Sequence, residues 1–254
     1  MQIILSKDAR TTSATAARLI LTQIKQKPNS LIALPSGPTP VEMFEQIVLS
    51  YQKGEVDFSQ ARFIGVDEYL GLGKDHPDSV AQSLHARFFV PCNIQEKQIR
   101  LIDGAQDPQI EVESFGAWIS EAGGIDLIVT GIGLNGHLAY NEPAESLFPH
   151  VHVNGLGENT RLSLLKDFSD QTEVPSRIIT LGMADFLHAK KLAVVATGPN
   201  KSSVVRRLVE AKTFSTFFPA SILMLHDNAI LVVDEVAGKE LKPEVIASSL
   251  ETSF

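Results

Sequence analysis

Short runs of apolar and β-branched residues recur along the whole chain, separated by segments of mixed polarity. Such runs predict strands, and they read IILS, SLIALP, ARFIGVDEYL, QIRLID, GIDLIVTGIG, RIITLG, KLAVVATG and NAILVVDE. Segments between them place apolar residues three and four positions apart, which predicts amphipathic helices over residues 12–24, 40–51, 78–89 and 200–211. This alternation predicts an α/β fold with an open, mostly parallel sheet and helices on both faces.

The chain offers no sign of a domain boundary. It has 254 residues, of which 44% are hydrophobic and 20% are charged, so it can bury a full core. We find no fixed-period repeat, low-complexity tract or Pro/Gly/Ser-rich linker. The sequence therefore predicts one Rossmann-like domain over residues 1–254, in which a weakly periodic, polar stretch over about 148–175 is a candidate lid.

Charge and apolar content exclude several classes of partner. The net charge is −8 and the 22 basic residues are scattered, which argues against a nucleic-acid surface. The N-terminal segment lacks the features of a signal peptide, and no stretch is apolar enough to span a membrane, so we expect a cytoplasmic protein. The single cysteine, Cys92, excludes an intramolecular disulfide.

Three strand ends carry polar residues of the kind that form sites, because ligands bind at the carboxyl ends of parallel strands. The first junction is ALPSGPTP, where backbone N–H groups at the start of a helix suit an anion. Ser36 and Thr39 add hydroxyl donors, and Gly37 allows close approach of the backbone. Ordinary helix capping explains the same residues, so this junction alone is ambiguous.

The second junction, VDEYLGL, places two carboxylates side by side. Asp67 and Glu68 follow an apolar run with no basic residue nearby in sequence. Adjacent carboxylates at a strand end favour acid–base chemistry. Burial beside Glu68 would raise the pKa of Asp67 toward neutrality. A structural role for one of the two, such as capping a helix, remains an equal alternative.

The third junction, GIGLNGHLAYNEP, is the richest in polar groups. It brings Asn135, His137 and Glu142 within eight residues. Histidine is the side chain best suited to gain and lose a proton near neutral pH, and the neighbours of His137 could orient its ring, as general-base catalysis requires. The pattern GIGLNG is a weak dinucleotide signal without the acidic residue that normally follows. A metal site formed by His137 and Glu142 with His150 and His152 is a competing hypothesis. The spacings do not match H-E-x-x-H or a similar pair of ligands on one helix.

Taken together, ALPSGPTP, VDEYLGL with DHPDS after it, and GIGLNGHLAYNEP resemble the glucosamine-6-phosphate deaminase family from about Ile32 to Leu241. Related 6-phosphogluconolactonases lack the combination of DEYxGL and NEP and form the alternative class. NGHLAYNEPAESL and FFPASILMLH are also similar to galactosamine-6-phosphate isomerases, and the sequence does not settle the preference at C4 of the sugar. The stretch FPHVHVNGLGENTR lacks the basic residues of allosterically activated members.

The resemblance implies roles for individual residues and an activity without metal or organic cofactor. Its substrate would be a small amino-sugar phosphate, and family members range from monomers to hexamers, which leaves a homo-oligomer open. Asp67 would move a proton between C2 and C1 of the opened sugar, supported by Glu68. His137 would open the ring with Glu142 and Asn135, which stands where many members have Asp. The residues implied for the 6-phosphate are Ser36, Gly37, Thr39, Arg161 and Lys201.

Overall fold

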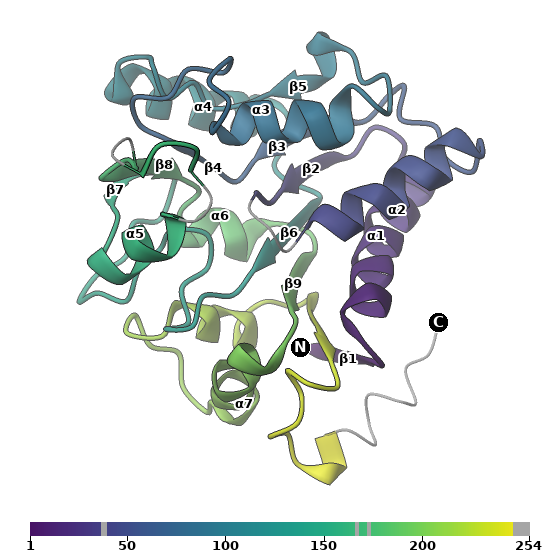
Figure 1. Ribbon diagram of the computed structural model, residues 1–254, viewed down its shortest axis with the longest axis vertical. Coiled ribbons are helices and arrows are strands. Elements are labelled where there is room, and N and C mark those ends of the chain that lie inside the picture. Colours follow the sequence, from purple (N-terminus) through teal and green to yellow (C-terminus); the bar gives the residue numbers. More distant parts are fainter. Residues whose placement is uncertain (37–39, 166–167, 172–173, 246–254) are drawn as a thin grey trace.

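A parallel sheet forms the centre of the computed structural model, which describes residues 1–36, 40–165, 168–171 and 174–245. Seven strands lie in the order β1-β10-β9-β6-β2-β3-β5, and each neighbouring pair is parallel (Figure 1). They are β1 (Gln2–Ser6), β2 (Leu31–Leu34), β3 (Arg62–Gly65), β5 (Ile99–Arg100), β6 (Leu127–Gly131), β9 (Leu192–Ala196) and β10 (Ala229–Asp234). The predicted parallel α/β architecture is confirmed.

Helices cover both faces of this sheet. They are α1 (Ala9–Gln26), α2 (Val41–Gln52), α3 (Val80–Leu84), α4 (Pro108–Glu121), α5 (Glu158–Leu164), α6 (Met183–His188) and α7 (Ser202–Glu210). Along β2, Ile32 and Leu34 pack in a cluster with α1 and α2, whereas Leu31 and Ala33 pack in a cluster with α4, α6 and α7. Successive strand residues point to opposite faces, so a strand covered on both sides is apolar throughout. Within the described ranges, no helix is long and apolar enough to cross a membrane.

Short helical turns modify the predicted helices. The predicted helix over 78–89 is α-helical only to Leu84 and continues as a π-helical turn over His85–Phe89. The amide of Val90 donates to the carbonyl of His85, five residues earlier, which is the hydrogen bond that defines such a turn. The 3₁₀ turns are Glu96–Gln98, Pro199–Lys201 and Pro219–Met224.

A second, antiparallel sheet lies beside the first (Figure 1). Its strands, in spatial order, are β4 (Asp67–Tyr69), β8 (Arg177–Thr180) and β7 (His152–Gly155). The apolar run over 61–70, predicted as one strand, divides at Val66 between the two sheets. The N–H of Val66 donates to the carbonyl of Leu34 at the end of β2, and the carbonyl of Val66 accepts from the N–H of Leu181 just after β8. Val66 therefore directs the two carboxylates that follow it away from the central sheet.

Candidate active site

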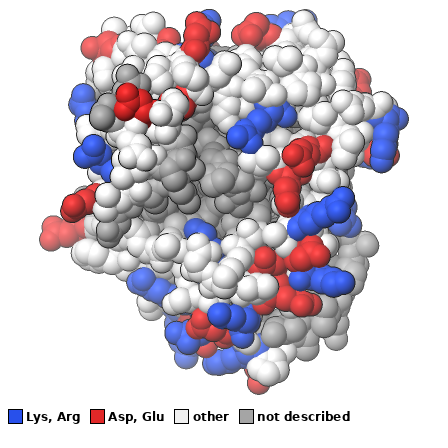
Figure 2. All heavy atoms as spheres, in the orientation of Figure 1, with Lys and Arg blue, Asp and Glu red and all other residues white. Residues whose placement is uncertain are grey.

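The predicted junctions meet at one edge of the central sheet. Strands β3, β2, β6 and β9 are neighbours in that order, and each is followed by one of the polar segments. Parallel strands place their carboxyl ends at the same edge. Figure 2 shows this face hollowed near its middle, with acidic and basic side chains scattered around it. The arrangement agrees with the prediction that the site forms where these strands end.

Asp67 is a buried carboxyl at this edge. Its side chain belongs to β4, the residue is 4% exposed, and Oδ1 accepts a hydrogen bond of 3.1 Å from Oγ of Ser36. Burial raises the pKa of Asp67 to about 7, against the opposing effect of the Ser36 hydroxyl. Desolvation rather than the charge of Glu68 is therefore the cause of the shift. Gly37 and Thr39, predicted beside Ser36, lie outside the described residues.

Glu68 is engaged differently from Asp67. Its Oε1 accepts from the N–H groups of Tyr69 and Val80, and its Oε2 accepts from the N–H group of Ala81. Val80 and Ala81 open helix α3, so the carboxylate caps that helix. Burial raises the pKa of Glu68 to about 7, against the effect of these three donors. Capping α3 is the structural role that the sequence left open for one of the two carboxylates, and it occupies both oxygens of Glu68.

The loop after β6 is a tight turn built on glycine. The N–H of Gly133 donates to the carbonyl of His137, and the N–H of Gly136 donates to that of Gly133. Gly136 has a φ of 90°, which favours glycine, and a Cβ atom there would lie 2.1 Å from the ring of Phe218. The turn fixes the backbone on both sides of Asn135 and His137.

Asn135, His137 and Glu142 come together in this loop as predicted. Nδ1 of His137 lies 3.2 Å from Oε1 of Glu142, outside hydrogen-bond alignment. Asn135 links the Glu142 side chain to the His137 backbone, since its Nδ2 donates to Oε2 of Glu142 at 2.7 Å and its Oδ1 accepts from the backbone N–H of His137 at 3.1 Å. Burial favours the neutral form of Glu142, but its interactions with His137, together with donors from Thr160 and Asn135, hold its pKa at about 2. Glu142 therefore stays ionised beside the imidazole.

The two predicted cations occupy different positions. Lys201 follows β9, and its Nζ donates to the carbonyl of Ile132 at 2.6 Å, which brings the ammonium to the loop of His137. Arg161 lies on α5, is exposed, and directs Nη2 to the carbonyl of Val174 at 3.5 Å. Lys201 thus lies at the edge with the other residues, whereas Arg161 lies on the separate helix α5 and contacts Val174.

Three residues that the sequence did not single out connect these parts. The hydroxyl groups of Tyr69 and Tyr140 lie 3.0 Å apart, and the Tyr140 ring stacks beside His137. The Tyr140 N–H donates to Oγ1 of Thr180, which pairs directly with Asp67 across β4 and β8. Both tyrosines lie inside the quoted motifs, so their place in the motifs was an available signal. No sequence signal marks Thr180.

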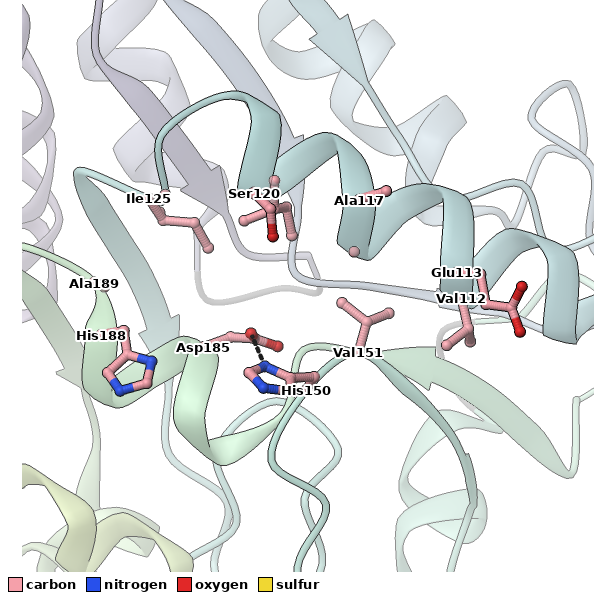
Figure 3. Close-up of a pocket in the computed structure, with 13 residues that line it drawn as sticks. Val112, Glu113, Ala117, Ser120, Ile125, His150, Val151, Asp185, His188 and Ala189 are labelled. Carbon is pink, nitrogen blue, oxygen red and sulfur yellow. Dashed lines mark hydrogen bonds and ion pairs between the residues drawn. The ribbon is translucent and has the colours of Figure 1, made fainter.

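The histidines of the competing metal hypothesis are directed elsewhere. His150 pairs with Asp185 through Nδ1 at 3.0 Å, and Nδ1 of His152 bonds to the carbonyl of His150. Figure 3 shows His150 and Asp185 lining a separate cavity between α4 and α6. Its volume is about 430 Å³. Among the described residues, no group of three or more His, Cys, Asp or Glu is arranged to hold a metal ion.

The raised pKa of Asp67 predicts a pH-dependent cost in stability. Between about pH 4 and pH 7, the unfolded chain has lost the Asp67 proton while the folded protein still holds it, so this group's contribution to stability falls as pH rises. Asp67→Asn removes this dependence. We expect the stability of the variant relative to the wild type to rise by on the order of 3 kcal/mol from pH 4 to pH 8 in denaturant unfolding. The exposed control Asp227→Asn should show no such trend, and a flat Asp67→Asn difference would contradict the assigned burial.

Fold and site together define an α/β protein of the class that binds a small polar molecule at the carboxyl edge of a parallel sheet, with titratable side chains gathered there. The profile of the family described as glucosamine-6-phosphate isomerases/6-phosphogluconolactonase matches residues 6–232. The chain is 35% identical over 245 residues to the glucosamine-6-phosphate deaminase of Thermoanaerobacter sp. (strain X514), covering 96% of each. It is 37% identical over 242 residues to the enzyme of that name from Shewanella loihica, covering 95% of this chain and 90% of that one. The chain belongs to the glucosamine-6-phosphate isomerase/6-phosphogluconolactonase family, which confirms the resemblance drawn from the motifs.

Solved structures agree with this assignment. A monomeric glucosamine-6-phosphate deaminase superposes with a TM-score of 0.90 at 30% identity, covering 94% of this chain and 99% of that one. A 6-phosphogluconolactonase from Trypanosoma cruzi superposes with a TM-score of 0.75 at 18% identity, covering 95% and 97%. The second likeness shows a shared fold alone.

Proposed function

We propose that this chain is a glucosamine-6-phosphate deaminase that converts glucosamine 6-phosphate and water to fructose 6-phosphate and ammonia. The observation that carries the proposal is the buried Asp67 carboxyl, whose pKa of about 7 suits a group that both takes and returns a proton. Relatives that bear this name match almost the full chain at 35% identity or above. The lactonase alternative shares the description of the family profile, but the 6-phosphogluconolactonase from Trypanosoma cruzi is only 18% identical and shows a shared fold alone.

The chemistry requires a proton to move from C2 to C1 of the open-chain sugar. Asp67, in its ionised form, takes the proton from C2 and delivers it to C1. The oxygen on C1 gains the proton that the amine nitrogen loses, so C1 becomes a hydroxymethyl carbon and the C2 amine becomes an imine. Water then hydrolyses the imine to the ketone and ammonia. Glu68 supports Asp67 by holding the start of α3 in place. Positioned acid–base groups suffice for the proton transfer and the hydrolysis.

Ring opening precedes this transfer and falls to His137. The imidazole takes the proton of the C1 hydroxyl as the bond from C1 to the ring oxygen breaks, and it then returns that proton to the ring oxygen, which becomes the C5 hydroxyl. Glu142 stabilises the imidazolium that forms because it is ionised and lies 3.2 Å from Nδ1. Asn135 accepts from the backbone N–H of His137 and donates to Oε2 of Glu142, so it fixes the Glu142 carboxylate against this loop without ionising itself.

The phosphate group is a dianion and needs donors and positive charge. Hydrogen-bond donors come from the first junction, at Ser36, Gly37 and Thr39, and positive charge comes from Lys201 and Arg161.

Phosphorylated sugars do not cross membranes unaided, so we place the enzyme in the cytoplasm, where such substrates are formed.

Removing the Lys201 ammonium is expected to weaken substrate binding more than catalysis. For Lys201→Met we expect KM to rise about 10–100-fold while kcat changes by less than about 5-fold, because the lost interaction with the phosphate is the same in ground and transition states. Steady-state kinetics measure both constants, and Lys25→Met on the exposed end of α1 is the matched control. An unchanged KM would remove Lys201 from the phosphate site.

The proposed function is tested by offering three substrates in parallel. Purified protein receives glucosamine 6-phosphate, galactosamine 6-phosphate and 6-phosphogluconolactone, with ammonia release and lactone opening followed separately. We expect ammonia from glucosamine 6-phosphate at the highest kcat/KM. Preferential release from galactosamine 6-phosphate would reassign the preference at C4, and lactone opening alone would reject the proposal.

A further inference from the structure

The hydroxyl of Thr160 reaches the active-site loop from a separate part of the chain. Thr160 lies on α5, and its Oγ1 donates to Oε1 of Glu142 at 2.6 Å. This is the same carboxylate oxygen that lies 3.2 Å from Nδ1 of His137. A hydroxyl that donates to an ionised carboxylate forms a strong, short hydrogen bond.

Together, Thr160 and Asn135 hold both oxygens of Glu142. Asn135 donates to Oε2 from within the loop, and Thr160 donates to Oε1 from α5. A carboxylate held at one oxygen can still rotate about its last bond, because such torsions are broad. The second donor removes that freedom and fixes Oε1 opposite the imidazole.

Helix α5 is itself anchored to the body of the protein. Leu164, its last residue, and Leu156, two residues before its start, are buried in the cluster that contains Tyr69. Farther along, the ring of Phe168 packs edge-on against Tyr69, with centroids 5.2 Å apart. Ser169 donates to Oδ2 of Asp78 at 2.6 Å, which ties the same segment to the loop after β4. Thr160 is therefore presented to Glu142 from a packed support.

We propose that Thr160 is a positioning residue for ring opening. It holds Oε1 of the Glu142 carboxylate next to Nδ1 of His137. The inference rests on the proposed function. The hydroxyl acts through Glu142, so its loss is expected to slow the step in which His137 gains a proton. Substrate binding is left to the phosphate contacts.

Three variants separate this role from a general loss of packing. Thr160→Val keeps the shape and removes the donor, Thr160→Ser keeps the donor, and Ser169→Ala cuts another tether of the segment without touching Glu142. We expect Thr160→Val to lower kcat for ammonia release at least about 10-fold with KM within about 2-fold. Thr160→Ser should restore kcat to within about 3-fold of the wild type, and Ser169→Ala should leave it unchanged.

The outcomes are distinguishable from failure of the proposed function, because the wild type is measured alongside. If the wild type releases ammonia and Thr160→Val matches it, the positioning role is wrong and the function stands. Equal losses in Thr160→Val, Thr160→Ser and Ser169→Ala would assign the effect to packing and also overturn the inference. A wild type without ammonia release rejects the proposed function itself.

Discussion

Asp67→Asn is expected to lower kcat for ammonia release from glucosamine 6-phosphate by about 10²–10⁴-fold, the range that a positioned general base contributes. The amide has nearly the same shape and can still accept the Ser36 hydroxyl, but it cannot take a proton from C2. In the wild type, kcat/KM should rise as pH increases through about 7, where the carboxyl loses its proton. Initial rates over a pH series measure both effects.

The matched control for Asp67→Asn is Asp227→Asn, which makes the same chemical change at an exposed carboxylate. It should retain the rate and the pH profile of the wild type. If Asp67→Asn kept activity within a few-fold of the wild type, another group would have to move the proton. The buried carboxyl would then be a structural residue.

His137→Gln is expected to lower kcat by about 10²–10³-fold, because glutamine has no group that titrates near neutral pH. Its amide can still contact Glu142, so the loop should keep its fold and thermal unfolding should change little. His188→Gln, at an exposed position on α6, is the control and should keep full activity. A His137→Gln variant that opened the ring at the wild-type rate would leave the His137 and Glu142 pair without its assigned task.

Much of the fold could be predicted from the sequence because apolar runs report burial directly. A central strand such as β2 is covered on both faces, so LIAL is apolar at every position. Strand β7 was not predicted, because HVNG has no apolar run and becomes a strand only by pairing with β8. The division of residues 61–70 at Val66 depends likewise on hydrogen bonds to Leu34 and Leu181, distant in sequence.

The site shows the same boundary between local and distant information. Asn135, His137 and Glu142 fall in one loop, so their association could be read from spacing alone. That Asp67 and Glu68 have different partners could also be predicted from the sequence, since neighbouring residues in a strand point to opposite faces. The contact from Thr160 was not, because it depends on how α5 packs. The predicted lid over about 148–175 contains β7 and α5 and stays a prediction.

The central claim is that one active site couples proton transfer to loss of the amine. The most direct test is to measure ammonia and fructose 6-phosphate together, in one reaction, from glucosamine 6-phosphate with the wild type and with Asp67→Asn. We predict equal amounts of the two products from the wild type, and a parallel loss of both in the variant. Ammonia without fructose 6-phosphate, or undiminished formation of both products by Asp67→Asn, would contradict the account.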